Sequence, residues 1–189
     1  MRELSLFTGG GGGVLASKLL GHRVVGYVEW EPYAQEVIRQ RIADGHLDAA
    51  PIFGDIRAFV RDGYARAYRG MVDLVSGGFP CQPFSVAGKR AGHADERNMW
   101  PATVEVLREV RPRFAFLENV PGLLTCADER GRPYIHTVFG DLAELGFDCR
   151  WGVVGADDAG APHRRKRLWI VGRMGHAEQP PAHAHAARG

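Results

Sequence analysis

The feature that most constrains the fold of this chain is the alternation of short apolar runs with amphipathic segments over its first two-thirds. Short apolar runs are typical of buried strands, and segments with an apolar residue every three or four positions are typical of helices that cover a sheet. The alternation predicts an α/β fold, built of βα units around a mostly parallel sheet. We expect strands at residues 4–7, 23–28, 72–76, 113–117 and 168–171, with a further strand ahead of Asp55.

Three segments carry helix signals. Pro32 and Pro101 each open a segment with helical periodicity, and proline is favoured in the first turn of a helix. A third segment ends at Gly146, a residue type that commonly closes helices. The apolar faces of the first and third segments consist of Ala34, Val37, Ile38 and Ile42, and of Ile135, Val138, Phe139, Leu142 and Leu145.

The size and composition of the chain fit one globular domain. Its 189 residues are 45% hydrophobic, which is enough for a core but leaves no room for a second full domain. The formal charge of +2 gives no sign of nucleic-acid binding at the level of the whole chain, so local basic clusters must carry that argument. Three cysteines without paired spacing indicate reduced thiols and a cytoplasmic protein. We expect no signal peptide, membrane span or metal site, a folded domain at 1–174 and a disordered tail at 175–189.

A glycine-rich turn, residues 7–13, follows the first expected strand and opens a helix. Glycines let backbone N–H groups approach a ligand closely, and residues 11–16 satisfy a loose dinucleotide-binding pattern. Five consecutive glycines also match such patterns by chance, so a flexible turn without a ligand is the alternative.

Acidic residues follow the next two expected strands. Glu29 ends the second strand, where a carboxylate can accept both ribose hydroxyls, and Trp30 offers an apolar face to a purine. Asp55 could accept from an adenine amino group. The alternatives are that Glu29 is a charge near a helix N-terminus and that Asp55 is a helix N-cap.

A cysteine loop spans residues 76–85 and follows the expected strand that ends at Ser76. Loops at the carboxyl ends of strands form the ligand crevice of open α/β sheets, so Cys81 lies where a substrate would bind. Pro80 and Pro83 flank it and hold it rigidly. A lone cysteine is more often a small buried hydrophobic residue than a nucleophile, so its context must decide.

Four motifs in order resemble those of the DNA cytosine-5 methyltransferases: Phe7-x-Gly9-x-Gly11-Gly12, Pro80-Cys81-Gln82-x-Phe84-Ser85, Glu118-Asn119-Val120 and Arg165-x-Arg167. The similarity covers residues 3 to 173. Gly10 stands where the family more often has a larger residue, and His163 stands where it usually has glutamine. The resemblance implies a Rossmann-like methyltransferase domain that uses S-adenosylmethionine.

The resemblance also implies a role for each motif residue. Cys81 adds to C6 of cytosine, Glu118 acts as the acid near N3, and Asn119 fixes the loop and the carboxyl group. Arg167 holds the cytosine O2, and Arg165 supports the loop and its charge. The residues expected at the cofactor are Phe7, Gly9, Gly11, Gly12, Glu29, Trp30, Asp55 and Ile56.

The substrate implied is double-stranded DNA with the target base extruded from the stack. Gln82, Ser85 and Lys89 are the residues expected to contact it, and the segment 86–98 is expected to close over it, with a plain surface loop as the alternative. Family members continue into a target-recognition region, so we expect this chain to be a fragment, a degenerate copy, or one half of a split enzyme whose partner chain supplies recognition.

Three other functions compete with this one. A related branch of the family methylates cytosine in transfer RNA with the same motifs. A module that binds cofactor or nucleic acid without turnover is a non-enzymatic alternative. A nicotinamide dehydrogenase would explain the glycine turn but gives no reason for Pro80-Cys81-Gln82 or Glu118-Asn119-Val120.

Overall fold

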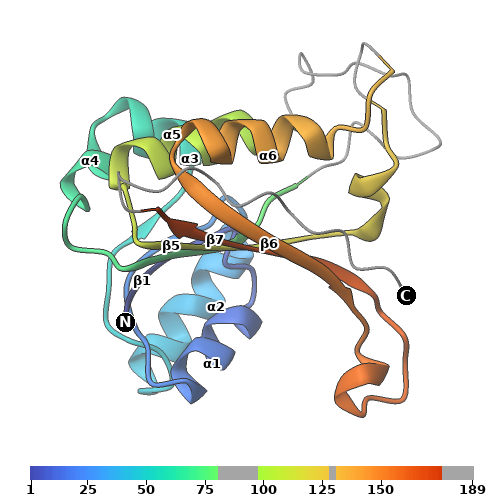
Figure 1. The fold of residues 1–189 in the computed structure, drawn as a ribbon. Coiled ribbons are helices and arrows are strands. Elements are labelled where there is room, and N and C mark those ends of the chain that lie inside the picture. The colour runs from blue at the N-terminus through green and yellow to red at the C-terminus, as the bar shows by residue number, and fades with distance from the viewer. Residues whose placement is uncertain (81–97, 128–130, 176–189) are drawn as a thin grey trace.

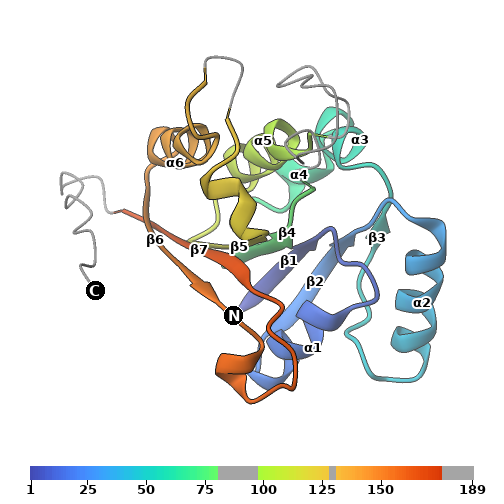
Figure 2. The same cartoon turned by 90° about the vertical axis from the view of Figure 1, so that its right-hand side faces the viewer.

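The computed structural model describes residues 1–80, 98–127 and 131–175, and within them a single sheet of seven strands (Figure 1). The order across the sheet is β3-β2-β1-β4-β5-β7-β6, which Figure 2 shows from the side. Five strands run parallel: β1 (Arg2–Leu6), β2 (Arg23–Val28), β3 (Ile52–Phe53), β4 (Leu74–Gly78) and β5 (Phe114–Asn119). The strand β7 (Arg167–Met174) runs antiparallel to both β5 and β6 (Phe147–Val154).

Helices lie on both faces of the sheet. On one face, α1 (Gly12–Leu19) and α2 (Pro32–Ala43) lie under β1 to β3 (Figure 1). The other face carries α3 (Ile56–Arg61), α4 (Tyr64–Ala67), α5 (Trp100–Val110) and α6 (Ile135–Glu144). Two short 3-10 helices, η3 (Pro121–Leu124) and η4 (Asp157–Ala159), follow β5 and β6.

The core is divided in the same way. The larger cluster packs α3 to α6 against the sheet and includes Leu4, Val75, Leu117 and Ile170. A smaller cluster under α1 and α2 is centred on Ile38. The mostly parallel α/β fold expected from the sequence is therefore confirmed.

The expected helices and all of the expected strands are present, with ends shifted by up to three residues. Pro32 opens α2, Pro101 lies in the first turn of α5, and Gly146 follows α6 with a left-handed φ of 89°. The first strand ends one residue earlier than expected, because Phe7 leaves it with a φ of 51°. The strand β6, which pairs with β7 over eight residues, was not among the expected strands.

One glycine fixes how closely two strand ends approach. Gly77 in β4 faces the last residue of β1, and a Cβ atom at Gly77 would lie 2.7 Å from the carbonyl oxygen of Leu6. Real Cβ atoms do not approach a backbone oxygen so closely, so only glycine fits there. The ends of β1 and β4 are consequently held against each other at the edge where the candidate motifs lie.

The expected tail falls outside the described residues from 176 onward. None of the helices in the described ranges is long and apolar enough to cross a lipid bilayer.

Candidate active site

The motifs meet at one edge of the sheet because the carboxyl ends of parallel strands share an edge. The glycine turn follows β1, Glu29 follows β2, Asp55 follows β3, and Glu118 lies near the end of β5. The antiparallel strand β7 starts at this edge, which brings Arg167 beside Glu118.

The glycine turn adopts backbone angles that explain its composition. Gly9 and Gly11 have φ values of 57° and 84°, a region that glycine enters without steric cost. Gly11 is the N-cap of α1, and Gly12 begins the helix. Phe7 also has a positive φ, which is uncommon for a residue with a side chain and is typical of functional turns. The turn therefore presents the start of α1 at the sheet edge.

Glu29 holds this turn from the neighbouring strand. Its side chain is 8% exposed, and its Oε2 accepts a hydrogen bond of 2.6 Å from the backbone N–H of Gly9. Its Oε1 accepts from the backbone N–H of Glu31, the N-cap of α2, at 2.8 Å. The alternative of a charge near a helix N-terminus thus describes one of its contacts, while the other places the carboxylate on the glycine turn.

Trp30 and Asp55 occupy different environments near Glu29. Trp30 is 70% exposed, so its ring is accessible to a ligand. Asp55 is the N-cap of α3, with Oδ1 accepting from the N–H of Arg57 at 2.9 Å. Ile56, in the first turn of that helix, is buried. The N-cap alternative for Asp55 therefore holds in the structure, and a contact to an adenine amino group stays a prediction.

The cysteine loop begins at the end of β4, and the structure describes it only as far as Pro80, which is exposed. Cys81, Gln82, Ser85 and Lys89 lie outside the described residues. Asn119 is buried and donates from Nδ2 to the carbonyl oxygen of Phe79 at 3.0 Å. The predicted role of Asn119 in fixing this loop is consistent with that bond, which fastens the chain two residues before the cysteine.

The described residues on either side of the segment 81–97 lie in the core, and the sequence did not single them out as anchors. The rings of Phe79 and Trp100 lie 4.8 Å apart and are buried. Asn98, also buried, donates to the hydroxyl of Tyr134 at 2.9 Å. The indole N–H of Trp100 donates to Asp141 of α6 at 2.7 Å. The only signals in the sequence for this anchoring were the aromatic residues themselves, Phe79 next to the cysteine motif and Trp100 after it.

Glu118 and Arg167 form an ion pair at the sheet edge. The Nε of Arg167 donates to Oε1 of Glu118 at 2.8 Å, and its Nη1 donates to the carbonyl oxygen of Lys166 at 2.9 Å. The pair is partly exposed, as a site for a substrate must be. Arg165 and His163 are exposed in the segment that leads into β7. The structure thus brings Arg167 to Glu118 and does not place Arg165 in the same contact.

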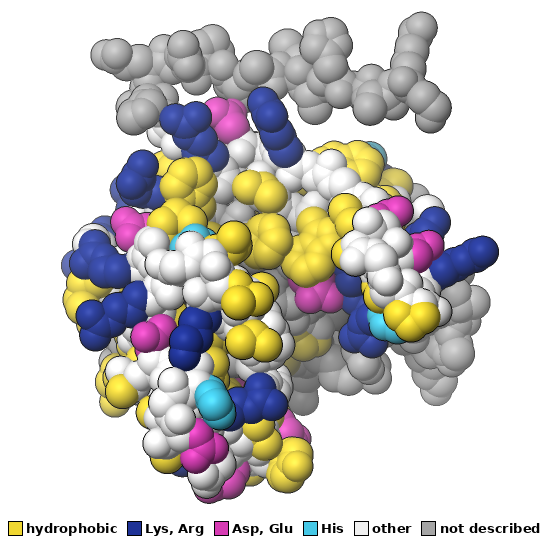
Figure 3. Space-filling model, turned by 90° about the horizontal axis from the view of Figure 1, so that it is seen from below, with side chains coloured by type: hydrophobic (Ala, Val, Ile, Leu, Met, Phe, Trp, Pro, Cys, Tyr) yellow, Lys and Arg dark blue, Asp and Glu magenta, His cyan; other side chains and the backbone are white. Residues whose placement is uncertain are grey.

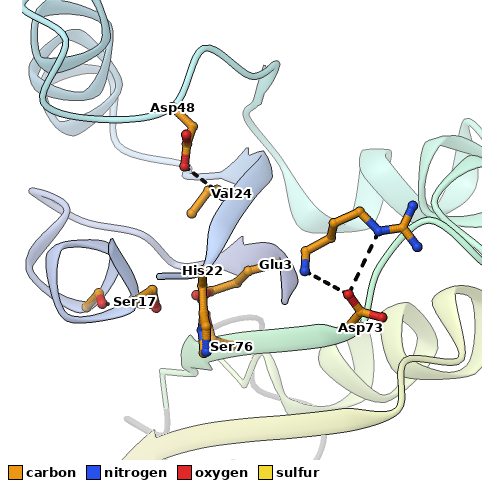
Figure 4. A network of polar contacts seen from close by, with 9 residues as sticks. Glu3, Ser17, His22, Val24, Asp48, Asp73 and Ser76 are labelled. Atoms are coloured by element: carbon orange, nitrogen blue, oxygen red, sulfur yellow. Dashed lines mark hydrogen bonds and ion pairs between the residues drawn. The ribbon is translucent and has the colours of Figure 1, made fainter. Parts of the chain in front are cut away.

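A buried polar cluster lies below the edge, between β1 and β4. Figure 4 shows the side chain of Glu3 pointing toward His22 and Ser76. The hydroxyl of Ser76 donates to Oε1 of Glu3 at 2.5 Å, and Nδ1 of His22 lies 3.4 Å from Oε2. Glu3 is 1% exposed, and a buried carboxylate needs such partners to offset its desolvation. This contact ties β4 to β1 at the first residue of the cysteine loop, and no sequence pattern had indicated it.

The strand order and the reversed β7 define the chain as a Rossmann-like methyltransferase domain, and solved structures of that class share its fold. A putative DNA modification methyltransferase from an Escherichia coli prophage has a TM-score of 0.68 at 25% identity, over 92% of this chain and 47% of that one. A DNMT2 variant from Spodoptera frugiperda has a TM-score of 0.72 at 21% identity, over 95% of this chain and 51% of that one.

The particular family follows from the sequence match. Residues 1–186 match the model of the C-5 cytosine-specific DNA methylases, and the chain belongs to that family. It is 36% identical over 169 residues to the type II methyltransferase M.NgoMIV of Neisseria gonorrhoeae, which covers 89% of this chain and 50% of that protein. It is 32% identical to the type II methyltransferase M.AquIA of Picosynechococcus, over 96% of this chain and 76% of that protein. The chain spans about half the length of M.NgoMIV and of two further type II methyltransferases that it matches, M.HpaII and M.NgoBI.

Proposed function

We propose that this chain is the catalytic part of an enzyme that transfers a methyl group from S-adenosylmethionine to C5 of cytosine in DNA. The observation that carries the proposal is the joint arrangement of Glu118, Arg167 and Asn119. The first two form an ion pair, and the third fastens the chain two residues before Cys81. Family membership adds the order of the motifs in which these residues lie.

The residues at the glycine turn fit the proposed cofactor. The turn offers backbone N–H groups at the start of α1, Glu29 offers a buried carboxylate for ribose hydroxyls, and Trp30 an exposed ring for the purine. Phe7, Gly9, Gly11, Gly12, Asp55 and Ile56 complete the proposed set. When bound, S-adenosylmethionine supplies an electrophilic methyl group on a positively charged sulfur.

The chain itself supplies the activation of the base. In the proposed mechanism the thiolate of Cys81 forms a bond to C6 of cytosine, and the C5–C6 double-bond electrons become available at C5. A proton from the carboxyl group of Glu118 meets the charge that develops at N3. Because Arg167 occupies Oε1 of Glu118, we assign the donation to Oε2. After C5 takes the methyl group, water removes the C5 proton and its electrons re-form the C5–C6 double bond as the thiolate of Cys81 leaves C6. The proton on N3 returns to the carboxylate of Glu118, which restores the ring and the enzyme.

The base must leave the duplex to reach these groups. We assign the contacts to the phosphates and the DNA strand to Gln82, Ser85 and Lys89. Arg167 would hold O2 of the base, and Arg165 would support the loop with its charge. Target recognition would come from polypeptide outside this chain, including a second chain in a split enzyme. M.NgoMIV and M.HpaII are type II methyltransferases of bacteria, so we place this protein in the bacterial cytoplasm with its DNA.

A covalent trap tests the proposal. Release of the enzyme requires loss of the proton on C5, and a fluorine in its place cannot be lost in this way. The protein, incubated with S-adenosylmethionine and duplex DNA containing 5-fluorocytosine, should therefore give a covalent adduct that survives denaturation. C81S should give none, whereas C149S, which changes a cysteine in β6, should give the wild-type amount.

Each other result has a defined meaning. An adduct that persists in C81S would overturn the assignment of the nucleophile. An adduct formed only on RNA containing 5-fluorocytosine would transfer the proposal to RNA. The half of M.NgoMIV that this chain does not match is then added to the reaction. If the chain binds S-adenosylmethionine but still forms no adduct, it is a binding module.

A further inference from the structure

The two edges of the sheet differ greatly in length. At one edge, β3 has only two residues, Ile52 and Phe53, and pairs with β2. At the other edge, β6 has eight residues and pairs with β7 along its whole length without a register shift. No described strand pairs with the outer side of β6 (Figure 2). The described part of the chain therefore leaves one long row of backbone groups without a partner strand.

The strand β6 lacks the features that commonly protect an edge. Proteins keep edge strands from pairing with other chains by making them short or by placing bulges, prolines or lysines in them. The sequence of β6 is FDCRWGVV, with neither proline nor lysine. Trp151 is 52% exposed, and its ring lies against Phe139 of α6 with centroids 6.2 Å apart. A long, regular and partly apolar edge of this kind is able to pair with another strand.

The hydrogen bonds to β7 show which backbone groups of β6 face outward. Gly175 donates its N–H to the carbonyl oxygen of Gly146 at 2.9 Å, so this pair of opposite residues is hydrogen-bonded. Opposite residues of antiparallel strands alternate between hydrogen-bonded and non-bonded pairs. The next pair, Phe147 and Met174, is therefore non-bonded, and the N–H of Met174 indeed bonds to Arg113 on the other side. The outward backbone groups of β6 thus belong to Phe147, Cys149, Trp151 and Val153.

Charge selects one way in which two such edges can pair antiparallel about a two-fold axis. Because the outward groups belong to odd-numbered residues, Asp148 and Arg150 fall in the non-bonded pairs of the new contact, where side chains are closest. An axis at residue 148 or 150 would place two like charges opposite each other, and an axis at Trp151 would place both charges opposite uncharged residues. An axis beside Cys149 places Asp148 of each copy opposite Arg150 of the other, a favourable cross-strand pair.

The side chains needed for this contact are available. Asp148 and Arg150 are both exposed, and within residues 1–80, 98–127 and 131–175 neither has an ion-pair partner. The same axis places Trp151 opposite Phe147 of the second copy, and aromatic cross-strand pairs stabilise sheets. The chain has a formal charge of only +2, and basic and acidic side chains are interspersed on the face seen in Figure 3. Long-range repulsion between two copies is therefore weak.

We infer that two copies of this chain associate through β6, so that their sheets join across a two-fold axis beside Cys149. A second copy is the occupant that the charges favour, because the same two residues then satisfy each other twice. The paired residues 147–151 lie at the end of β6 away from Arg167, which is opposite Val154. The contact therefore leaves the sheet edge with Glu118 and Arg167 open in both copies, and it does not depend on the proposed function.

The test measures the mass of the whole chain in solution. Analytical ultracentrifugation over a concentration series gives the Kd of the dimer for the wild type, D148R, R150D and the double variant D148R/R150D. E36R is the matched control, because it reverses an exposed carboxylate on α2 whose partner is Arg39 of the same helix. Circular dichroism melting confirms that each variant is folded.

We expect the wild type and E36R to dimerise with the same Kd. Each single reversal on β6 turns two attractive pairs into two repulsive ones, so it should raise Kd at least about tenfold. The double variant restores opposite charges across the axis, and its Kd should return to within about threefold of the wild type.

A wild type that stays monomeric over the whole series would overturn the inference. So would a dimer that D148R and R150D leave intact, since its contact would lie elsewhere on the molecule. A dimer that the single reversals dissociate and the double variant does not restore would refute the axis beside Cys149. Equal weakening by E36R would show a general effect of charge and would also count against β6.

Discussion

Replacing Gly77 with alanine tests the close approach of β1 and β4 directly. The new Cβ would lie 2.7 Å from the carbonyl oxygen of Leu6 and 3.0 Å from its Cβ. Both contacts are to the backbone or its first side-chain atom, which cannot swing away, so the two strands must separate by several tenths of an ångström. The hydroxyl of Ser76 next to it holds Glu3 across the same pair of strands, so the shift also strains a buried polar contact.

The cost follows from the size of the overlap. Overpacking a tight site typically costs about 1–3 kcal/mol. For a domain of this size each kcal/mol lowers Tm by about 2–4 °C. We therefore expect G77A to melt about 4–8 °C below the wild type for a cost of about 2 kcal/mol, and to unfold at lower urea concentration with an unchanged m-value.

The neighbouring glycine provides the control. A Cβ at Gly78 would lie 3.7 Å from Oε2 of Glu118, an ordinary contact, and neither glycine has a left-handed φ. G78A should therefore melt within about 1–2 °C of the wild type, with a small gain from reduced backbone freedom in the unfolded chain. If G77A melts at the same temperature as the wild type, the close approach of β1 and β4 does not exclude a side chain at position 77. The same conclusion follows if Tm falls as much in G78A as in G77A.

Three further outcomes are expected. Y134F removes a buried hydroxyl that accepts from Asn98, so urea unfolding should show a loss of about 1–3 kcal/mol; an unchanged midpoint would contradict the bond. R111G should raise stability by about 0.5–1 kcal/mol in thermal melts, since Arg111 ends α5 with a φ of 51° that glycine adopts freely, and a lower Tm would refute this. Burial, with Asp148 adding to it, raises the pKa of the Cys149 thiol to about 11. The raised pKa keeps the thiol protonated, so its alkylation, followed by mass spectrometry, should rise about tenfold per pH unit from 8 to 10; a plateau near pH 9, as in guanidinium-unfolded protein, would count against this.

Much of the fold could be predicted from periodicity because the parallel strands are short, apolar and separated by helices. The prediction failed at β6, where Phe147, Cys149, Trp151 and Val153 alternate with polar or small residues. That period of two is the signal of a half-covered antiparallel strand, which differs from the continuous apolar runs of the parallel strands. The strand was missed because its partner β7 follows it in sequence as a hairpin, outside the βα pattern.

The positions of Glu29, Glu118 and Asn119 at the sheet edge could be predicted because these residues lie in motifs at strand ends. Contacts between distant segments could not. The bond of Asn98 to Tyr134 joins residues 36 positions apart, and nothing in either local sequence indicates the other. Glu3 was missed for a related reason, since an acidic residue inside an apolar strand looks like an exposed position until its partners on other elements are known.

The antiparallel course of β7 has a consequence for the order in which the molecule folds. The strands β6 and β7 are neighbours in sequence and pair over eight residues, so their hairpin can close by a short-range step. Glu118 and Arg167 are 49 residues apart and meet only when the finished hairpin docks on β5. We expect both residues to have φ-values near zero in the folding transition state, with mutations of either one speeding unfolding while leaving the folding rate nearly unchanged. A molecule arrested before that docking step would have most of its helices and strands and still lack the ion pair at the sheet edge.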